Sequence, residues 1–350
     1  MRRAFPSLDA WPLALLVFCS AIGPLPFGLV GFVLQSAGRS TVGWDALGVL
    51  FAGAFTWWMG RFTAPVLGSS FVGTTWALAG AAFFLAGGGI SLHLWLEVLR
   101  VSEYPITPSW VIAAFTLSAV AYAARMGPEN LLRLAVPMAL VLAITVSIVM
   151  ALAWGLGDSG HLSGGSNLLL PDGRVPACWP LLLFASHGSV LLPVFGKYTH
   201  GALRWPATLA SVLAGVLLAC AYVLPIVVWN VAPALRAEFP LLHSITPVST
   251  IFFPVHRLAL LAFVPLQLNL LVQLASYVLA AMELVGRRTF PLASGPAVVL
   301  CCMTIIVLAV WPAPSFTVAH LAALWSLAGL LLFLAVPLVA RRPAPASAPA

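Results

Sequence analysis

Long apolar runs follow one another along nearly the whole 350-residue chain, separated by short segments that hold Pro, Gly and the few charged residues. A membrane-spanning helix needs roughly 20 apolar residues. Ten runs meet this requirement, at about 11–35, 42–60, 70–99, 108–124, 130–156, 178–197, 206–231, 257–285, 295–312 and 316–340. Only 7% of the residues are charged, against about 25% in soluble domains. The sequence therefore predicts an all-α integral membrane protein with about ten transmembrane helices.

The basic residues predict which side of the membrane each chain end occupies. Short loops on the cytoplasmic side carry an excess of Lys and Arg. With the N-terminus placed inside, 11 of the 16 Lys and Arg residues fall in inside segments. Adding or removing one span would mix the two sets. We expect a multi-pass membrane protein with both termini cytoplasmic, and we attribute the net charge of +7 to its loops rather than to a nucleic-acid partner.

The remaining segments define the expected organisation. Residues 1–340 are predicted to form a single transporter-like transmembrane domain, and the Pro/Ala-rich tail 341–350 is predicted to be disordered. Of the two longest outside loops, 155–177 and 232–256, the second is expected to contain a short interfacial helix. The five cysteines show no metal-ligand spacing, so we expect no metal and no cofactor. Paired carboxylates and nucleophile motifs are lacking too, which favours a non-enzymatic protein.

Helix breakers interrupt the middle of the first span, "CSAIGPLPFGLVG", at Gly23, Pro24, Pro26 and Gly28. The sixth span, "CWPLLLFASHGSVLLPVFGKY", carries a similar interruption at its "ASHGS" string. Backbone can leave the helix at membrane depth only where it is buried in protein or lines a cavity. We therefore predict that helices 1 and 6 are broken. The alternative is that these residues simply kink helices whose neighbours tolerate the bend.

The two interruptions lie five spans apart, which indicates an internal repeat. Transporters built from inverted repeats place discontinuous helices at corresponding positions of their halves, and an odd number of spans per half forces the inverted relation. We predict a five-plus-five inverted repeat, with one half over about 11–156 and the other over about 178–340. The short strings "LPFG" and "LPVFG" resemble each other but are not in register, so chance similarity is the alternative.

Broken helices offer unpaired N–H groups at one half-helix and unpaired C=O groups at the other. Together these ends suit a zwitterion, so an amino acid is the expected ligand. A neutral imidazole at the sixth break can donate a hydrogen bond to a carboxylate, although a packed structural histidine is the alternative. The predicted ligand-binding residues are Ser20, Gly23, Pro24, Gly28, Ser186, His187, Gly188 and Gln267. For Gln267, as for Asn269 and Gln273, interhelical hydrogen bonding is the competing explanation.

Two groups of charged or titratable residues are candidates for gating or for contact with a partner subunit. His93 and Glu97 are four residues apart near the outer end of the third span, where they can pair with each other. Arg125, Glu129 and Arg133 form a ladder of spacing four on the inside. Topology and ordinary helix-surface pairing are the alternatives. Glu283 is expected to pair with Arg287 in the same way.

One segment resembles a known family. "YPITPSWVIAAFTLSAVAYAARMGPENLLRLAVPM", residues 104–138, is similar to the fourth span and the following inside loop of the permease-like B subunit of spore germinant receptors. "NLLLPDG" and "FPLLHSIT" resemble two further elements of that family, so the likeness covers about 100–290. The shared positions are Thr107, Pro108 and Val111, the string Tyr122 to Arg125 with Gly127, and Glu129 with Arg133.

The resemblance implies a member of the amino acid–polyamine–organocation superfamily that acts with an A-type subunit and a lipoprotein C-type subunit in the spore inner membrane. Such a subunit would bind an amino acid or similar small germinant at the membrane midplane and trigger germination. A stand-alone secondary amino acid transporter in the bacterial cell membrane is the alternative. "FFPVHRLAL" keeps Arg257 but lacks the family's acidic residues, and "FASHGS" replaces its Gly-rich string, so the ligand is left open.

Overall fold

The structure is a computed structural model that describes residues 8–23, 25–37, 41–62, 66–67, 71–102, 105–163, 183–237, 239–245, 258–289, 295–335 and 340–341. Its long helices are α1 (Ala10–Ala21), α2 (Leu25–Ala37), α3 (Thr41–Met59), α4 (Phe71–Ser102), α5 (Ser109–Arg125), α6 (Pro128–Trp154), α10 (Arg204–Trp229), α14 (Leu258–Thr289), α15 (Gly295–Val310) and α16 (Ser315–Leu334). Short elements are α7 (Gly160–Ser163), η2 (Leu183–Leu191), α9 (Leu192–Phe195), η3 (Gly196–Tyr198), α11 (Val231–Arg236), α12 (Pro240–Ile245), β1 (Val66–Leu67) and β2 (Ala340–Arg341).

Each of the ten predicted spans contains helix in its described part, so the predicted helical membrane fold is confirmed. Five helices in the described part are long and apolar enough to cross a membrane by themselves. They lie at Gly73–Val101, Pro128–Trp154, Arg204–Trp229, Phe263–Val285 and Thr317–Leu334. The first span is divided between α1 and α2, each too short to cross alone, because the chain leaves the helix between them.

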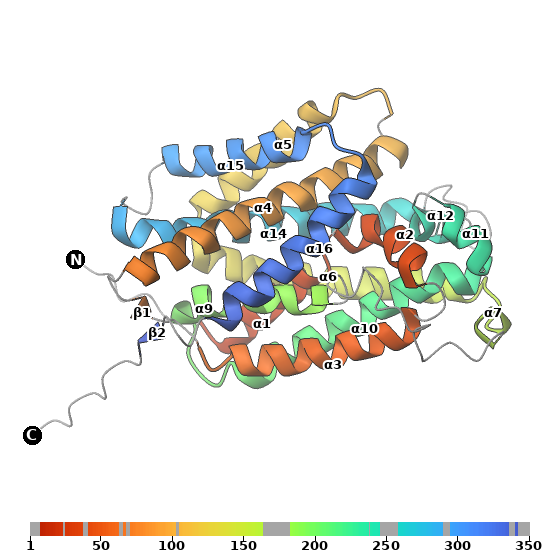
Figure 1. Cartoon of the computed structure of the whole chain (residues 1–350), viewed down its shortest axis with the longest axis horizontal. Helices are drawn as coiled ribbons and strands as arrows, with labels where there is room; N and C mark the ends of the chain where they lie inside the picture. The colour runs from red at the N-terminus through yellow and green to blue at the C-terminus, as the bar shows by residue number, and fades with distance from the viewer. Residues whose placement is uncertain are drawn as a thin grey trace, which may run out of the picture.

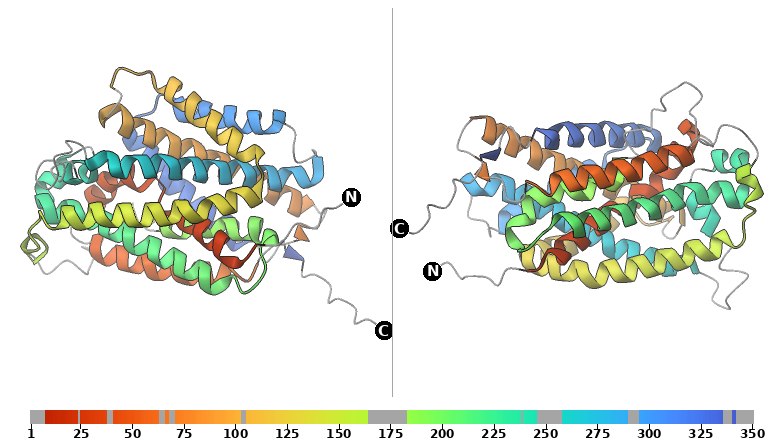
Figure 2. Two further views of the ribbon diagram at one scale, coloured as in Figure 1. Left: turned by 180° about the vertical axis from the view of Figure 1, so that it is seen from behind. Right: turned by 90° about the horizontal axis from the view of Figure 1, so that it is seen from below.

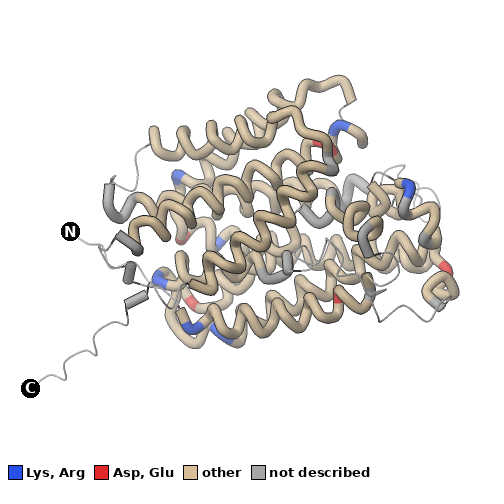
Figure 3. The backbone as a smooth tube through the Cα atoms, viewed as in Figure 1, with Lys and Arg blue, Asp and Glu red and all other residues tan. Residues whose placement is uncertain are grey.

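The long helices run roughly along one common direction (Figure 1), and both chain ends emerge at the same end of the bundle (Figure 2). That end also holds β1, β2 and α9, while α7, α11 and α12 lie at the opposite end. In the described part of the chain, most of the positions coloured as Lys or Arg lie toward the end where the termini lie (Figure 3). This asymmetry is the one expected if that end faces the cytoplasm.

Four of the five spans of the first half pack against the spans at the corresponding positions of the second half. α1 contacts η2, α3 contacts α10, α4 contacts α14 and α5 contacts α15. The α3–α10 pair is antiparallel: Gly53 faces Val212, whereas Gly60, further along α3, faces Arg204, which is earlier in α10. Antiparallel packing of a span with its counterpart, as in the α3–α10 pair, is what two halves of inverted topology produce.

The first span is broken, but over a shorter stretch than its four helix breakers suggested. α1 ends at Ala21 and α2 begins at Leu25, so the described break consists of Ile22 and Gly23. Pro26 is the second residue of α2, where a missing N–H costs nothing because the first N–H groups of a helix have no intrahelical partner. Gly28 consequently lies within α2 rather than in the break.

The sixth span departs from α-helical geometry without an open gap in its described residues. It is a 3₁₀ helix from Leu183 to Leu191, then one α-helical turn, and again 3₁₀ up to Tyr198. A 3₁₀ segment is tighter than an α-helix and often marks functional or strained backbone. The break predicted at "ASHGS" thus takes the form of a rewound helix, because Gly188 brings the backbone against α1.

Two predictions for the segments outside the spans are corrected. The outer loop was expected to hold one interfacial helix, but its described part holds α11 and α12, whose apolar side chains pack on α2 and α10. The tail was expected to be disordered from residue 341, yet Arg341 pairs with Val66 in a two-stranded antiparallel ladder between β2 and β1. α16 ends at Leu334, before the predicted 340, and Pro337 follows in the sequence. Residues 342–350 lie outside the described part.

Candidate binding site at the broken first helix

The carbonyl groups at the end of α1 receive hydrogen bonds from α14. A helix ends with carbonyls that lack an intrahelical partner. Here the Asn269 side-chain nitrogen lies 2.8 Å from the Cys19 carbonyl oxygen and 3.3 Å from that of Ile22. The Gln273 side-chain nitrogen lies 3.2 Å from the Ser20 carbonyl oxygen. Side chains four residues apart on α14 therefore cap the C-terminal end of α1 inside the membrane.

The same residues also present acceptors that are not used. A carbonyl can only accept, so the two amide NH₂ groups must face α1 and the amide oxygens must point elsewhere. Asn269 Oδ1, Gln273 Oε1 and Ser20 Oγ are buried and have no hydrogen-bond partner among the described residues. A buried acceptor without a donor costs roughly 1–3 kcal/mol. The break is thus lined by oxygens suited to a ligand that carries N–H or O–H donors.

Gly23 lies in the break beside Gln273. A Cβ atom built on Gly23 would lie 2.2 Å from Gln273 Oε1, which is far closer than non-bonded atoms approach. A side chain at position 23 would therefore displace the Gln273 amide. The predicted site residues Ser20 and Gly23 are brought together with the α14 amides, whereas Pro24 lies outside the described residues and the surroundings of Gly28 are not described.

His187 is buried in an aromatic cluster. Its ring centroid lies 4.6 Å from that of Trp325 on α16 and 6.4 Å from that of Phe83 on α4. Phe83 and Trp325 in turn stack on each other at 4.8 Å. The imidazole of the sixth span is therefore held by two other spans through ring packing. This placement fits both readings made from the sequence, a packed histidine and a donor near the break.

Gly188 fixes the distance between the first and sixth spans. A Cβ atom at this position would lie 2.1 Å from the Val17 carbonyl oxygen and 2.8 Å from its carbonyl carbon. The obstacle is backbone, which cannot move aside as the end of a side chain can. Only glycine allows η2 and α1 to meet at this depth. Ser186 precedes this contact in η2, and its side chain is outside the described set.

Gln267 lies apart from the break. Its amide oxygen accepts a hydrogen bond from the Trp95 indole, and its amide nitrogen lies 3.4 Å from the Thr116 hydroxyl. These partners belong to α4 and α5, and the three residues line a separate pocket of about 520 Å³. The eighth span holds three polar residues, and two of them, Asn269 and Gln273, contact the first span, whereas Gln267 does not. Asn269, Gln273 and Tyr277 follow one another at a spacing of four residues, which places them on one face of α14. This spacing is the sequence signal that could have identified the two amides.

The end of the bundle that holds the termini is closed by polar contacts. Lys197 and Tyr198 both bond to the buried Glu283 carboxylate of α14. Glu283 was expected to pair with Arg287, whose side chain lies outside the described set, so that pair stays a prediction. Beside them, the Leu8 amide donates to the Tyr198 carbonyl at 3.1 Å and the His200 amide donates to the Leu8 carbonyl at 2.8 Å. The segment before α1 is thus tied to the end of the sixth span.

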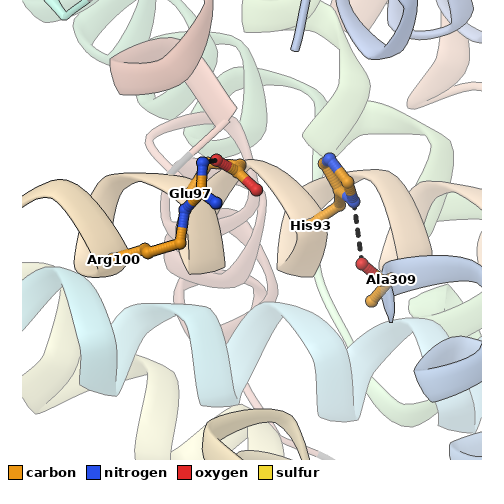
Figure 4. Close-up of polar contacts among 4 residues, drawn as sticks. All are labelled: His93, Glu97, Arg100 and Ala309. Carbon is orange, nitrogen blue, oxygen red and sulfur yellow. Dashed lines mark hydrogen bonds and ion pairs between the residues drawn. The ribbon is translucent and has the colours of Figure 1, made fainter. Parts of the chain in front are cut away.

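The predicted pair between His93 and Glu97 does not form (Figure 4). Glu97 forms a salt bridge of 2.8 Å with Arg100, and His93 Nδ1 lies 2.8 Å from the Ala309 carbonyl oxygen. His93 turns toward α15, where a carbonyl group is available, and the more exposed arginine takes the carboxylate.

The Arg125–Glu129–Arg133 ladder is divided by a turn. α5 ends at Arg125 and α6 begins at Pro128, with Gly127 at a φ of 87° between them. In the described part of the chain no salt bridge joins these three side chains. Arg125 and Arg133 are exposed at the end of the bundle where the termini lie. They remain available for contact with another molecule, which is the role that the sequence suggested.

A bundle of membrane-spanning helices with a broken first helix, buried polar groups at the break and paired halves is the architecture of secondary transporters and of proteins derived from them. Residues 59–162 match the model of a family described as spore germination protein. The resemblance to spore germination permeases is confirmed over this segment, which contains the "YAAR" string and the two residues Glu129 and Arg133.

A solved structure supports the fold over nearly the full length. The chain is similar to a Na⁺-coupled sialic acid symporter in a substrate-bound outward-open state, with a TM-score of 0.59 and 13% sequence identity. The match covers 94% of this chain and 76% of the symporter. At this identity the likeness concerns the fold. A search of curated protein sequences finds no match.

Proposed function

We propose that the protein is the nutrient-sensing membrane subunit of a spore germinant receptor. The observation that carries this proposal is the match of residues 59–162 to the spore germination family within a transporter-like fold. The subunit would lie in the spore inner membrane with both termini cytoplasmic, as the clustering of Lys and Arg beside the chain ends supports (Figure 3). Residues 1–340 would act as one transmembrane domain of two inverted halves.

The nutrient would bind at the break in the first span. The unpaired oxygens of Ser20, Asn269 and Gln273 suit an ammonium or other donor group, and the start of α2 offers helix N-terminal N–H groups suited to a carboxylate. An amino acid or a similar small zwitterion has both groups. Binding would favour one arrangement of the spans and signal germination. Exposed Arg125 and Arg133, with Glu129 between them, would contact the A-type or C-type subunit on the cytoplasmic side.

A stand-alone amino acid transporter is the second candidate, favoured by the likeness to a symporter over 94% of the chain. Transporters of this build hold a coupling cation on carbonyls at the ends of broken helices. Here the amide donors of Asn269 and Gln273 already point at the α1 carbonyls, and their positive N–H ends oppose a cation at those oxygens. The capped carbonyls do not fit such an ion, which supports sensing over ion-coupled transport.

A deletion strain separates the two functions. We expect its spores to lose germination in response to one or a few single nutrients, while vegetative uptake of amino acids is unchanged. Spores that germinate normally with every single nutrient, together with reduced uptake of one amino acid, would establish the transporter instead. A thermal-shift screen of the purified chain against amino acids, sugars and nucleosides then identifies the ligand, because a bound ligand raises the unfolding midpoint.

A further inference from the structure

An acidic side chain is buried in the second span. Asp45 is the fifth residue of α3 and is only 5% exposed. Its Oδ2 atom is buried without a hydrogen-bond partner among the described residues, and none of the salt bridges in that part of the chain includes it. Ionisable residues at membrane depth are costly and are candidates for function. Neither the proposed nutrient site nor the Glu283 ion pair uses this carboxyl group.

The pairing of α3 with α10 gives the depth of this carboxyl group. The two helices are antiparallel, with Gly53 opposite Val212. Eight residues before Gly53 and eight residues after Val212, the same register places Asp45 opposite Cys220, and the Asp45 carboxyl acts electrostatically on that thiol. Cys220 lies roughly 13 Å along α10 from Trp229, where α10 ends at the end of the bundle opposite the termini (Figure 1). Asp45 therefore lies well below that end.

The Asp45 side chain is on the face of α3 that meets α10. Ala52 and Thr56, seven and eleven residues further on, share this face. The Ser211 hydroxyl of α10 donates to the Ala52 carbonyl oxygen at 3.5 Å. Beside Asp45, the Trp44 indole nitrogen is also buried without a hydrogen-bond partner among the described residues. Two polar groups at this level of α3 are thus unsatisfied in the present arrangement of the spans.

The described charged groups around α3 do not neutralise an Asp45 carboxylate. α3 packs mainly against α10, η2 and α2, and α2 has no titratable residue. Arg204 of α10 lies against the other end of α3, roughly 22 Å along the helix from Asp45. The His187 ring of η2 packs on α4 and α16 instead. On α10, Tyr222 is turned by about 200° from Cys220, which leaves the thiol as the titratable group that faces Asp45.

A buried carboxylate without a cation or hydrogen-bond donors loses its hydration and gains nothing in return, so such a group takes up a proton. We propose that Asp45 is a proton-binding site, and that it holds its proton while α3 and α10 are packed as they are here. Release of the proton to water leaves a carboxylate that needs hydration. Water reaches it only if α3 separates from α10 toward the end opposite the termini.

Proton release and separation of these two spans are therefore coupled, and each promotes the other. A higher pH on that side of the membrane favours the separated arrangement, and a lower pH favours the packed one. This inference does not rest on the proposed function, because a receptor and a transporter both change the arrangement of their spans.

Infrared spectroscopy tests the bound proton. The full chain is measured in dodecyl maltoside micelles, which contain no carbonyl group, at about pH 7, where an exposed Asp carboxyl is ionised. A protonated carboxylic acid has a C=O stretching band that a carboxylate lacks. We expect this band in the wild type and its loss in Asp45→Asn, which has nearly the shape of the neutral acid. Asp9→Asn, which removes a 79% exposed carboxylate, is the matched control and should leave the band unchanged.

Identical bands in the wild type and in Asp45→Asn would overturn the proposal, because they would show that Asp45 is ionised. That result is expected if a basic residue outside the described part, such as Arg39, neutralises the carboxylate. Asp45→Leu, which is also neutral, gives the same comparison if Asp45→Asn fails to fold.

The coupling to span separation is measured at Cys220. The full chain in phosphatidylcholine nanodiscs is treated with a water-soluble maleimide at several pH values, and modification of Cys220 is quantified by peptide mass spectrometry. With one proton linked, the separated fraction rises by up to about tenfold per pH unit, so modification in the wild type should rise with pH more steeply than in Asp45→Asn. The variant corrects for the ordinary increase of thiolate with pH. Equal pH dependence in the two proteins would overturn the coupling.

Discussion

At the scale of single residues, Gly188 sets how closely the two halves approach. Replacing it by alanine places a methyl group against the Val17 backbone, at 2.1 Å from the carbonyl oxygen. We expect Gly188→Ala to destabilise the protein by roughly 1–3 kcal/mol, as overpacked cores do. Gly295→Ala is the matched control, because a Cβ atom there meets nothing within 4 Å. Thermal unfolding of both variants checks this, and equal midpoints would mean that the spans do not meet at Gly188.

The capped carbonyls of α1 lead to a second prediction at this scale. Because Asn269 and Gln273 donate to the oxygens that would otherwise hold a cation, nutrient binding should not require Na⁺. The thermal shift given by the best amino acid of the screen is expected to be the same in NaCl and in choline chloride. A shift that disappears in choline chloride would show that a cation joins the ligand at the break.

The residues of the site were only partly predictable. The string around Gly23 and the residues near Gly188 were identified from helix breakers, since glycine and proline act through the local backbone. Asn269 and Gln273 were noticed, but Gln267 was preferred as the ligand-binding residue. Which of these side chains reaches the break depends on how α14 is rotated against α1, and a single sequence does not contain that rotation. His93 likewise found its partner, Ala309, on another helix.

At the scale of elements, the C-terminal end of the sixth span is held to α14 by a buried ion pair. Glu283 is buried and bonded by both Lys197 and Tyr198. Removing one partner of a buried pair leaves an uncompensated charge, which costs about 3–5 kcal/mol. Lys197→Met should therefore be strongly destabilising, and adding Glu283→Gln should recover much of the loss.

A double-mutant cycle on thermal unfolding measures this coupling. The control pair is Glu97 with Arg100, which is far more exposed and is expected to contribute less than about 1 kcal/mol. Additive effects of Lys197→Met and Glu283→Gln would refute the role of this pair in holding the sixth span to α14.

Helix boundaries could be predicted from the sequence where a helix-breaking residue ends the helix at its own position. Gly127 and Pro128, between α5 and α6, are an example. The boundaries were less predictable where packing decides. The breakers from Gly23 to Gly28 suggested a longer gap than the one observed, because Pro26 fits the first turn of α2. The 3₁₀ winding of η2, which packs against α1, was not predicted either.

At the scale of the whole molecule, the proposed site lies between two closures. α11 and α12 pack on α2 at the end opposite the termini, and the segment around Leu8 is tied to the sixth span at the other end. The helical membrane fold was predicted from apolar runs, which are a property of the entire chain, and the cytoplasmic side of both termini stays a prediction from the basic loops. The ladder between β1 and β2 was not, because two-residue strands leave no periodic pattern in a sequence.

The central claim is that the break in the first span, faced by α14, is where a nutrient acts on a germination receptor. Spores carrying Gln273→Leu and spores carrying Gln267→Leu, at equal protein levels, test it directly. Both variants replace the same residue type on the same helix, but only Gln273 bonds to the end of α1. Germination is measured as the nutrient concentration for half-maximal response. We predict at least a tenfold increase for Gln273→Leu, about 1.4 kcal/mol of binding free energy, and little change for Gln267→Leu. Unchanged sensitivity in Gln273→Leu spores would contradict the account.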